Sequence, residues 1–179
     1  IVSLPLEVVR RSIAYVPPES YLLGTTIGEN IAFGEAAEHN LDLQEAAERA
    51  ALTRDLNERL QPASKRLKEG GTDLSGGQKQ RVNIARGLYK NAPYLLLDDS
   101  FSALDAISAS TIINTLRAGR EQTLLFISQR LEALRDADRI VVFKDGTIVE
   151  EGSHDALLAR KGEYYRLYEK QIEGGEGLE

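Results

Sequence analysis

A serine, two glycines and a glutamine lie at the start of a predicted helix, in the run Leu74-Ser75-Gly76-Gly77-Gln78. The first N–H groups of a helix have no partner within it, and the helix dipole places partial positive charge at that end. Glycine lets a ligand approach the backbone closely. A phosphate or similar anion is the ligand that this arrangement would bind. The alternative is an ordinary serine cap followed by a glycine turn.

Two carboxylates follow an apolar run. Residues 94–97 predict a strand buried on both faces of a parallel sheet, and Asp98 and Asp99 come directly after it. A second buried strand is predicted at 123–127, shortly before Gln129. Because ligands lie at the carboxyl ends of parallel strands, Asp98 and Gln129 are candidates for one site. Asp98 supplies the hard oxygen that Mg²⁺ prefers, whereas the alternative is that the two aspartates only end a strand.

The elements that must position these residues alternate between strands and helices. A strand is predicted at 12–16, where Pro17 and Pro18 end it, and Asp105 is predicted to cap a helix. The other predicted elements are helices at 27–33, 41–60, 75–91 and 131–135, a hairpin around Asp145-Gly146, and a helical end. This order predicts an α/β fold with a largely parallel sheet and an inserted α-helical part.

The composition is that of a globular chain of 179 residues, with 42% hydrophobic and 28% charged residues. The net charge of −6 disfavours nucleic acid as a partner, and the lack of cysteine excludes disulfides and thiolate metal sites. Apolar stretches fall short of the roughly 18 residues that span a bilayer, so we expect no direct membrane insertion of this segment. Since the chain has no methionine, we expect it to be part of a longer polypeptide.

These motifs resemble those of the ABC-type ATPases over nearly the whole chain. Leu74–Gln78 matches the family's signature, LSGGQ, while residues 95–98 resemble its Walker B strand and residues 102–105 its D-loop. Residues 15–17 and 26–34 resemble the Q-loop region of ABC exporters. Glu69 resembles the glutamate of their X-loop, and residues 149–154 resemble their C-terminal segment. The resemblance implies a P-loop NTPase-like ABC ATPase core made of 1–16 and 93–179. A helical subdomain with the signature would comprise 17–92.

The same resemblance implies the ligands and partners. ATP and Mg²⁺ would be the cofactors, with Asp98 as the metal ligand and Asp99 and Gln129 as catalytic residues. The domain would pair head to tail with a second ABC ATPase domain and contact transmembrane helices at the cytoplasmic face of the cell membrane. The residues expected to bind ATP, across that pairing, are Ser75, Gly76, Gly77, Gln78 and Asp105.

Four departures from the family pattern concern catalysis. No glycine is followed by lysine, so the phosphate-binding P-loop (Walker A) is missing, and we expect the chain to be truncated before the Q-loop. Asp99 stands where the family has glutamate, whose side chain is longer. Gln129 stands where the family has histidine, and a glutamine side chain cannot titrate. Pro18 stands where the family has the Q-loop glutamine. The alternative is that the neighbouring Glu19 supplies the missing side-chain oxygen. His39 and His154 are expected at the surface or near caps and replace none of these.

The departures fall on the chain's own ATP site, whereas the signature and D-loop offered to a partner are intact. This asymmetry predicts the degenerate, hydrolysis-impaired half of a heterodimeric ABC exporter, whose signature completes the ATPase site of the partner. One alternative is a pseudo-ATPase that acts as a regulatory or dimerisation module. A soluble ABC ATPase acting on DNA or ribosomes is the other, which the exporter-like segment and the acidic charge disfavour.

Overall fold

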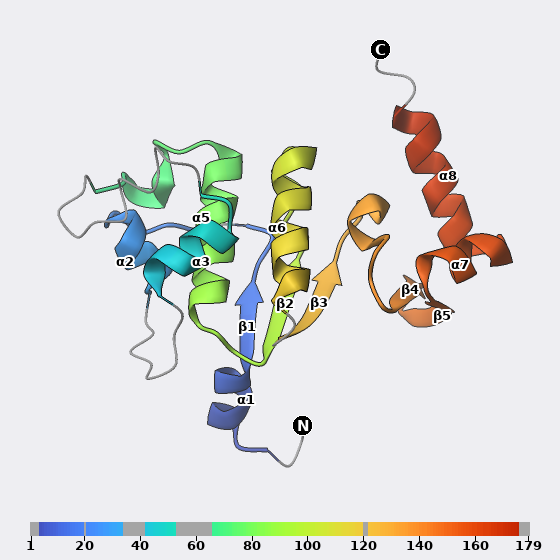
Figure 1. The fold of residues 1–179 in the computed structure, drawn as a ribbon, viewed down its shortest axis with the longest axis horizontal. Helices are drawn as coiled ribbons and strands as arrows, with labels where there is room; N and C mark the ends of the chain where they lie inside the picture. The colour runs from blue at the N-terminus through green and yellow to red at the C-terminus, as the bar shows by residue number, and fades with distance from the viewer. Residues whose placement is uncertain (1–3, 20, 34–41, 53–65, 120–121, 176–179) are drawn as a thin grey trace. The chain divides into compact units, whose positions relative to one another are not determined.

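The computed structural model describes residues 4–19, 21–33, 42–52, 66–119 and 122–175. The chain forms two compact units, Ile1–Ile127 and Ser128–Glu179. Figure 1 shows the elements of both units in chain order.

The first unit contains a three-stranded parallel sheet in the order β1-β2-β3, made of β1 (Ile13–Val16), β2 (Tyr94–Asp98) and β3 (Thr123–Ile127). Tyr15 pairs with Leu96 across β1 and β2, and Asp98 pairs with Ile127 across β2 and β3. Long helical connections link these strands, as parallel pairing requires. The predicted α/β class and the three predicted strands are confirmed.

Helices make up most of the rest of the first unit. The helical elements of the first unit are α1 (Leu6–Ser12), α2 (Ile27–Ile31), α3 (Leu43–Arg49), the 3₁₀ turn η1 (Glu69–Gly71), α5 (Gly76–Tyr89) and α6 (Ala106–Ala118). Figure 1 shows α5 and α6 running alongside the strands. The sequence analysis did not predict α1, and the part of the predicted helix 41–60 from residue 53 onward lies outside the described residues.

The core of this unit lies on one face of the sheet. Val16, Leu95 and Leu97 are buried there. Helix α5 reaches this face at Gly87, where an added Cβ would lie 2.5 Å from Cγ2 of Val16. Glycine therefore permits an approach that no larger residue allows.

Two predictions are wrong: that 94–97 is buried on both faces and that 123–127 is a second buried strand. On the second face Tyr15, Tyr94, Leu125 and Ile127 are 52%, 53%, 57% and 50% exposed. Successive side chains of a strand point to opposite faces. The packing of α5 covers only one of them, and in the part of the chain that the structure describes the other stays accessible.

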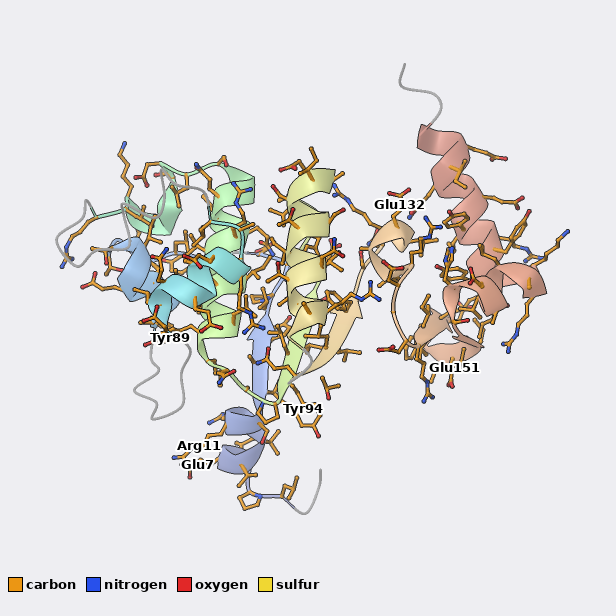
Figure 2. All side chains as sticks on the ribbon, in the orientation of Figure 1. Glu7, Arg11, Tyr89, Tyr94, Glu132 and Glu151 are labelled. Atoms are coloured by element: carbon orange, nitrogen blue, oxygen red, sulfur yellow. The ribbon has the colours of Figure 1, made fainter. Side chains whose placement is uncertain are left out.

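The second unit is a hairpin with helices. It comprises η2 (Leu131–Leu134), the antiparallel strands β4 (Ile140–Lys144) and β5 (Thr147–Gly152), α7 (His154–Arg160) and α8 (Glu163–Gly175). Asp145 and Gly146 have φ angles of 50° and 77°, so the predicted Asp-Gly turn is confirmed. Figure 2 labels Glu132 on η2 and Glu151 on β5.

His154 lies next to the Ser153 cap of α7, as expected, but it is buried rather than at the surface. It is 6% exposed, and its Nδ1 lies 2.9 Å from the hydroxyl oxygen of Tyr164 in a core that also contains Leu157. The tyrosine supplies the hydrogen-bond partner that a buried imidazole needs, and this pairing was not visible in the sequence. His39 lies outside the described residues.

Candidate functional site

Ser75 caps helix α5. Its hydroxyl accepts a hydrogen bond from the backbone N–H of Gln78 at 3.2 Å, and the Gln78 side-chain oxygen accepts one from the N–H of Ser75 at 2.9 Å. This reciprocal capping box fixes the start of a 14-residue helix. Gly76 and Gly77, as its first residues, have backbone N–H groups without a partner inside the helix. The donors needed for an anion are therefore present in a fixed geometry.

The signature lies against the D-loop. A Cβ added at Gly77 would be 3.2 Å from the carbonyl oxygen of Ala103, and one added at Gly76 would be 3.9 Å from the Ala103 Cβ. Gly77 therefore has a packing role within the unit in addition to the ligand role predicted from the sequence. The structure brings the signature and residues 102–105 together.

Asp105 caps the next helix, α6. Its carboxylate accepts hydrogen bonds from the backbone N–H of Ser108 at 2.8 Å and from the Ser108 hydroxyl at 2.7 Å. The backbone hydrogen bond from Ser108, followed by that from its hydroxyl, lowers the pKa of Asp105 below its ordinary value. Arg81 on α5 donates to the Ser108 hydroxyl at 3.1 Å. The signature helix and the D-loop are thus joined by hydrogen bonds as well as by close packing.

Asp98, the expected metal ligand, lies half-buried at the carboxyl end of β2. The hydroxyl of Tyr15 donates a hydrogen bond to its Oδ2 at 3.0 Å. This bond is the main cause of a raised pKa for Tyr15. The sequence analysis did not identify Tyr15 as a site residue. The signal was its alternate position in the strand, which puts its side chain on the same face of the sheet as Asp98.

Asp99 follows in a left-handed backbone conformation with φ of 43°. Its N–H donates to the carbonyl of Ile127 at 2.8 Å, and its carbonyl accepts from the Ser102 hydroxyl at 2.9 Å. The residue therefore links β2, the end of β3 and the D-loop. Aspartate enters the left-handed region more readily than most residues, so its backbone suits this junction.

Pro18 lies in an exposed bend after β1. The preceding carbonyls are held in place, because Asn83 donates to the oxygen of Pro17 at 3.2 Å and Ser100 donates to that of Val16 at 3.1 Å. Both donors are buried. The loop start is thus anchored to α5 and to the residue after Asp99, although Pro18 offers no side-chain amide.

Glu69, at the position of the X-loop glutamate, bonds residues that lie between the exporter-like stretches 15–17 and 26–34. It accepts hydrogen bonds from the Tyr21 hydroxyl at 2.6 Å and from the N–H of Gly24 at 3.2 Å. Tyr21 is exposed, and the hydrogen bond to Glu69 raises its pKa. Two segments 48 residues apart in the chain therefore form one surface.

Gln129 belongs to the second unit, whereas Asp98 and Asp99 belong to the first. Its carbonyl accepts a hydrogen bond from Nε2 of Gln171 on α8, while Oε1 of Gln171 accepts one from the N–H of Leu131 at 3.0 Å. One amide side chain thus holds the backbone on both sides of residue 130. The Gln129 side chain is exposed. No sequence signal pointed to Gln171.

The donors at Asp98 fit a magnesium ion that is held chiefly by a nucleotide. Within the described residues no cluster of three or more histidine, cysteine or acidic side chains could hold a metal alone. Mg²⁺ typically takes one or two carboxylates and completes its octahedron with phosphate oxygens and water. The single carboxylate of Asp98 at the end of β2 meets that requirement.

Two features define the class of this domain: Asp98 lies at the end of a parallel strand, and a capped helix that begins with two glycines packs against the D-loop. Together they define a nucleotide-binding domain of the ATP-binding-cassette class. The model of the ABC transporter family matches residues 4–102, more than half of the chain. The chain belongs to the ABC transporter family.

Known proteins similar to this chain include exporters. An ATP-dependent lipid A-core flippase of Syntrophus aciditrophicus is 44% identical over 165 residues, which is 91% of this chain and 27% of that protein. ATP-binding cassette sub-family B member 5 of Mus musculus is 40% identical over 88% of this chain and 13% of its own length. A solved structure of a bacterial Atm1-family ABC exporter with ATP bound superposes with a TM-score of 0.87 at 38% identity. It matches 96% of this chain and 30% of that one.

The chain therefore spans less than a third of the length of these three relatives. Among the helices of the described residues, none is both long and apolar enough to cross a membrane.

Proposed function

We propose that this chain is part of the ATP-binding domain of an exporter, and that it completes the ATP site of a partner domain more effectively than its own. The observation that carries the proposal is the division of its motifs. Ser75, Gly77 and Asp105, which would face the partner's ATP, lie in one hydrogen-bonded and closely packed assembly. The residues that would act on the chain's own ATP depart from the family pattern.

At the chain's own ATP site, the side chain at position 99 is shorter than in the family and the side chain at position 129 carries no charge. Asp99 is one methylene shorter than glutamate, and a displacement of about 1 Å can lower a rate about a hundredfold. Gln129 can donate a hydrogen bond to a phosphate, but it cannot carry a proton as imidazole does. Pro18 offers no amide to a metal or to water. We therefore assign slow hydrolysis to this site, with Asp98 holding the metal.

Mg²⁺, when bound with ATP, would neutralise charge that develops on the phosphates. The residues of the chain act around it. Asp98 would orient the ion, and the N–H groups of Gly76 and Gly77 would bind phosphate oxygens across the domain pair. The side chains of Ser75, Gln78 and Asp105 would position those groups through the two helix caps.

The partners in this proposal are a second ABC domain, arranged head to tail, and transmembrane helices at the cytoplasmic face of the cell membrane. The exporters similar to this chain support both partners. Tyr21, which lies between the exporter-like residues 15–17 and 26–34, forms a surface with Glu69 that would transmit movement to those helices. We assign residues 17–92 to the helical subdomain and residues 1–16 and 93–179 to the α/β core.

Analysis of the nucleotide bound to each domain tests the proposal. The full-length transporter with its partner is incubated with Mg²⁺ and radiolabelled 8-azido-ATP, cross-linked by light, and separated into its two ABC domains. We expect ATP on this domain and ADP on the partner during turnover. Equal amounts of ADP on both domains would contradict the assignment of slow hydrolysis to this one.

A pseudo-ATPase module is the second candidate, favoured by the same departures at Asp99, Gln129 and Pro18. It predicts that the assembled pair hydrolyses no ATP, because the partner would also lack a working carboxylate. Measurable turnover by the pair, lost when the partner's catalytic carboxylate is replaced, would exclude it.

A further inference from the structure

Tyr15 lies beside the expected metal ligand, and the family resemblance of residues 15–17 gives its side chain no role. It stands in β1, and Asp98 stands at the end of the neighbouring strand β2. Tyr15 pairs with Leu96 in the parallel register, so the tyrosine and Asp98 are two residues apart along the sheet and on the same face. Its hydroxyl donates to Oδ2 of Asp98 at 3.0 Å.

This hydrogen bond uses one of the two carboxylate oxygens. Among the described residues, no other side chain donates to the Asp98 carboxylate. A carboxylate held at Oδ2 by one donor has Oδ1 available for a cation. Groups that hydrogen-bond a metal ligand in this way fix its orientation, and their loss typically lowers metal affinity about 10-fold to 100-fold.

We propose that Tyr15 is a positioning residue that orients Asp98 for the magnesium ion of this chain's ATP site. The proposal rests on the proposed ATP site, since it takes Asp98 as the metal ligand. The ring of Tyr15 does not need to touch the nucleotide. Its role is to hold one carboxylate oxygen so that the other meets the ion in a single orientation.

Tyr94 supplies a matched control. It is also a tyrosine on the exposed face of the same sheet, 53% exposed against 52% for Tyr15. It begins β2, at the opposite end of that strand from Asp98, as its label in Figure 2 shows. Replacing either tyrosine by phenylalanine removes one hydroxyl and keeps the ring, so the two substitutions are the same in size. Only Tyr15→Phe also removes the hydrogen bond to Asp98.

The test measures metal dependence rather than activity. In the full-length transporter with its partner, labelling of this domain by 8-azido-ATP is titrated with free Mg²⁺. Labelling in EDTA serves as the reference for folding and for metal-independent binding. We expect Tyr15→Phe to raise the half-saturating Mg²⁺ concentration about tenfold, at the low end of the range because the contact is partly exposed. Tyr94→Phe should leave it within about twofold.

Asp98→Asn separates this inference from the proposed function. A large increase in half-saturating Mg²⁺ for Asp98→Asn, with no change for Tyr15→Phe, would overturn the role of Tyr15 and leave the site assignment intact. No change for Asp98→Asn would overturn the site assignment and the inference with it. Equal losses of labelling with and without Mg²⁺ for Tyr15→Phe would show a structural role only.

Discussion

Replacing Gly87 by alanine should destabilise the first unit, although alanine favours helices. Gly87 lies inside α5, where the helix approaches β1 and β2. An added Cβ would lie 2.5 Å from Cγ2 of Val16 and 3.3 Å from Cδ1 of Leu95. Contacts between carbon atoms are favourable at about 3.5–4.0 Å, so the helix must move by about 1 Å or Val16 must change. Val16 is fully buried and β-branched, and it cannot turn away easily.

The magnitude follows from two opposing terms. Overpacking a well-packed core costs about 1–3 kcal/mol, and replacing glycine in a helix interior by alanine gains about 1 kcal/mol. The net expectation is a loss of up to about 2 kcal/mol in the free energy of unfolding. Val16→Ala removes the methyl group that causes the clash. In the double variant the two changes should therefore compensate by about 1–2 kcal/mol relative to their sum.

Equilibrium urea unfolding of the chain, followed by circular dichroism, measures this coupling. The four proteins of the cycle are the unchanged chain, Gly87→Ala, Val16→Ala and the double variant. Additive effects within about 0.3–0.5 kcal/mol would show that Gly87 and Val16 do not interact, and would refute the close approach of α5 to the sheet.

Three further predictions concern the site. Hydrogen bonds from Ser108 lower the pKa of Asp105 in the folded state. The stability that these bonds provide is therefore fully present above the ordinary pKa of 3.8, and it is lost as the pH falls through the lower pKa of the folded state. Between about pH 6 and pH 3 the midpoint of thermal unfolding should therefore fall less for Asp105→Asn than for the unchanged chain. If the two midpoints fell in parallel with pH, the cap would not contribute this stability. The isolated chain should not bind a fluorescent ATP analogue at micromolar concentrations, because it has no Gly-Lys pair; saturable micromolar binding would be the contrary result. Asp99→Glu combined with Gln129→His should increase the ADP cross-linked to this domain of the full-length transporter, and an unchanged ratio of ADP to ATP would count against slow hydrolysis arising from these two residues.

The sequence predicted the local features of the site well, because short-range rules determine them. The caps at Ser75 and Asp105 depend on side chains that bond N–H groups three residues ahead. The turn at Asp145 and Gly146 depends on residues that adopt positive φ. The position of Asp98 follows from the end of an apolar run. Each of these signals lies within a few neighbouring residues.

Features that depend on residues far apart in the chain were not predicted. Tyr15 reaches a carboxylate 83 residues away, and this contact needs the register of β1 against β2. Gln171 bonds the backbone 40 residues before it, which needs the packing of α8 beside η2. The error about strand burial has the same origin, since the length of an apolar run does not say how many of its faces a helix covers.

The most direct test of the division of roles compares Gly77→Asp with Asp99→Ala in the full-length transporter with its partner. Any side chain at Gly77 presses against the Ala103 carbonyl, 3.2 Å from its Cβ, so Gly77→Asn is measured as the neutral control of equal size. Like charges facing each other across an interface cost several kcal/mol, and each 1.36 kcal/mol is a factor of ten in rate. Steady-state ATPase activity should fall at least about a hundredfold for Gly77→Asp, clearly less for Gly77→Asn, and only modestly for Asp99→Ala. Loss of turnover in Asp99→Ala with normal turnover in Gly77→Asp would contradict the account.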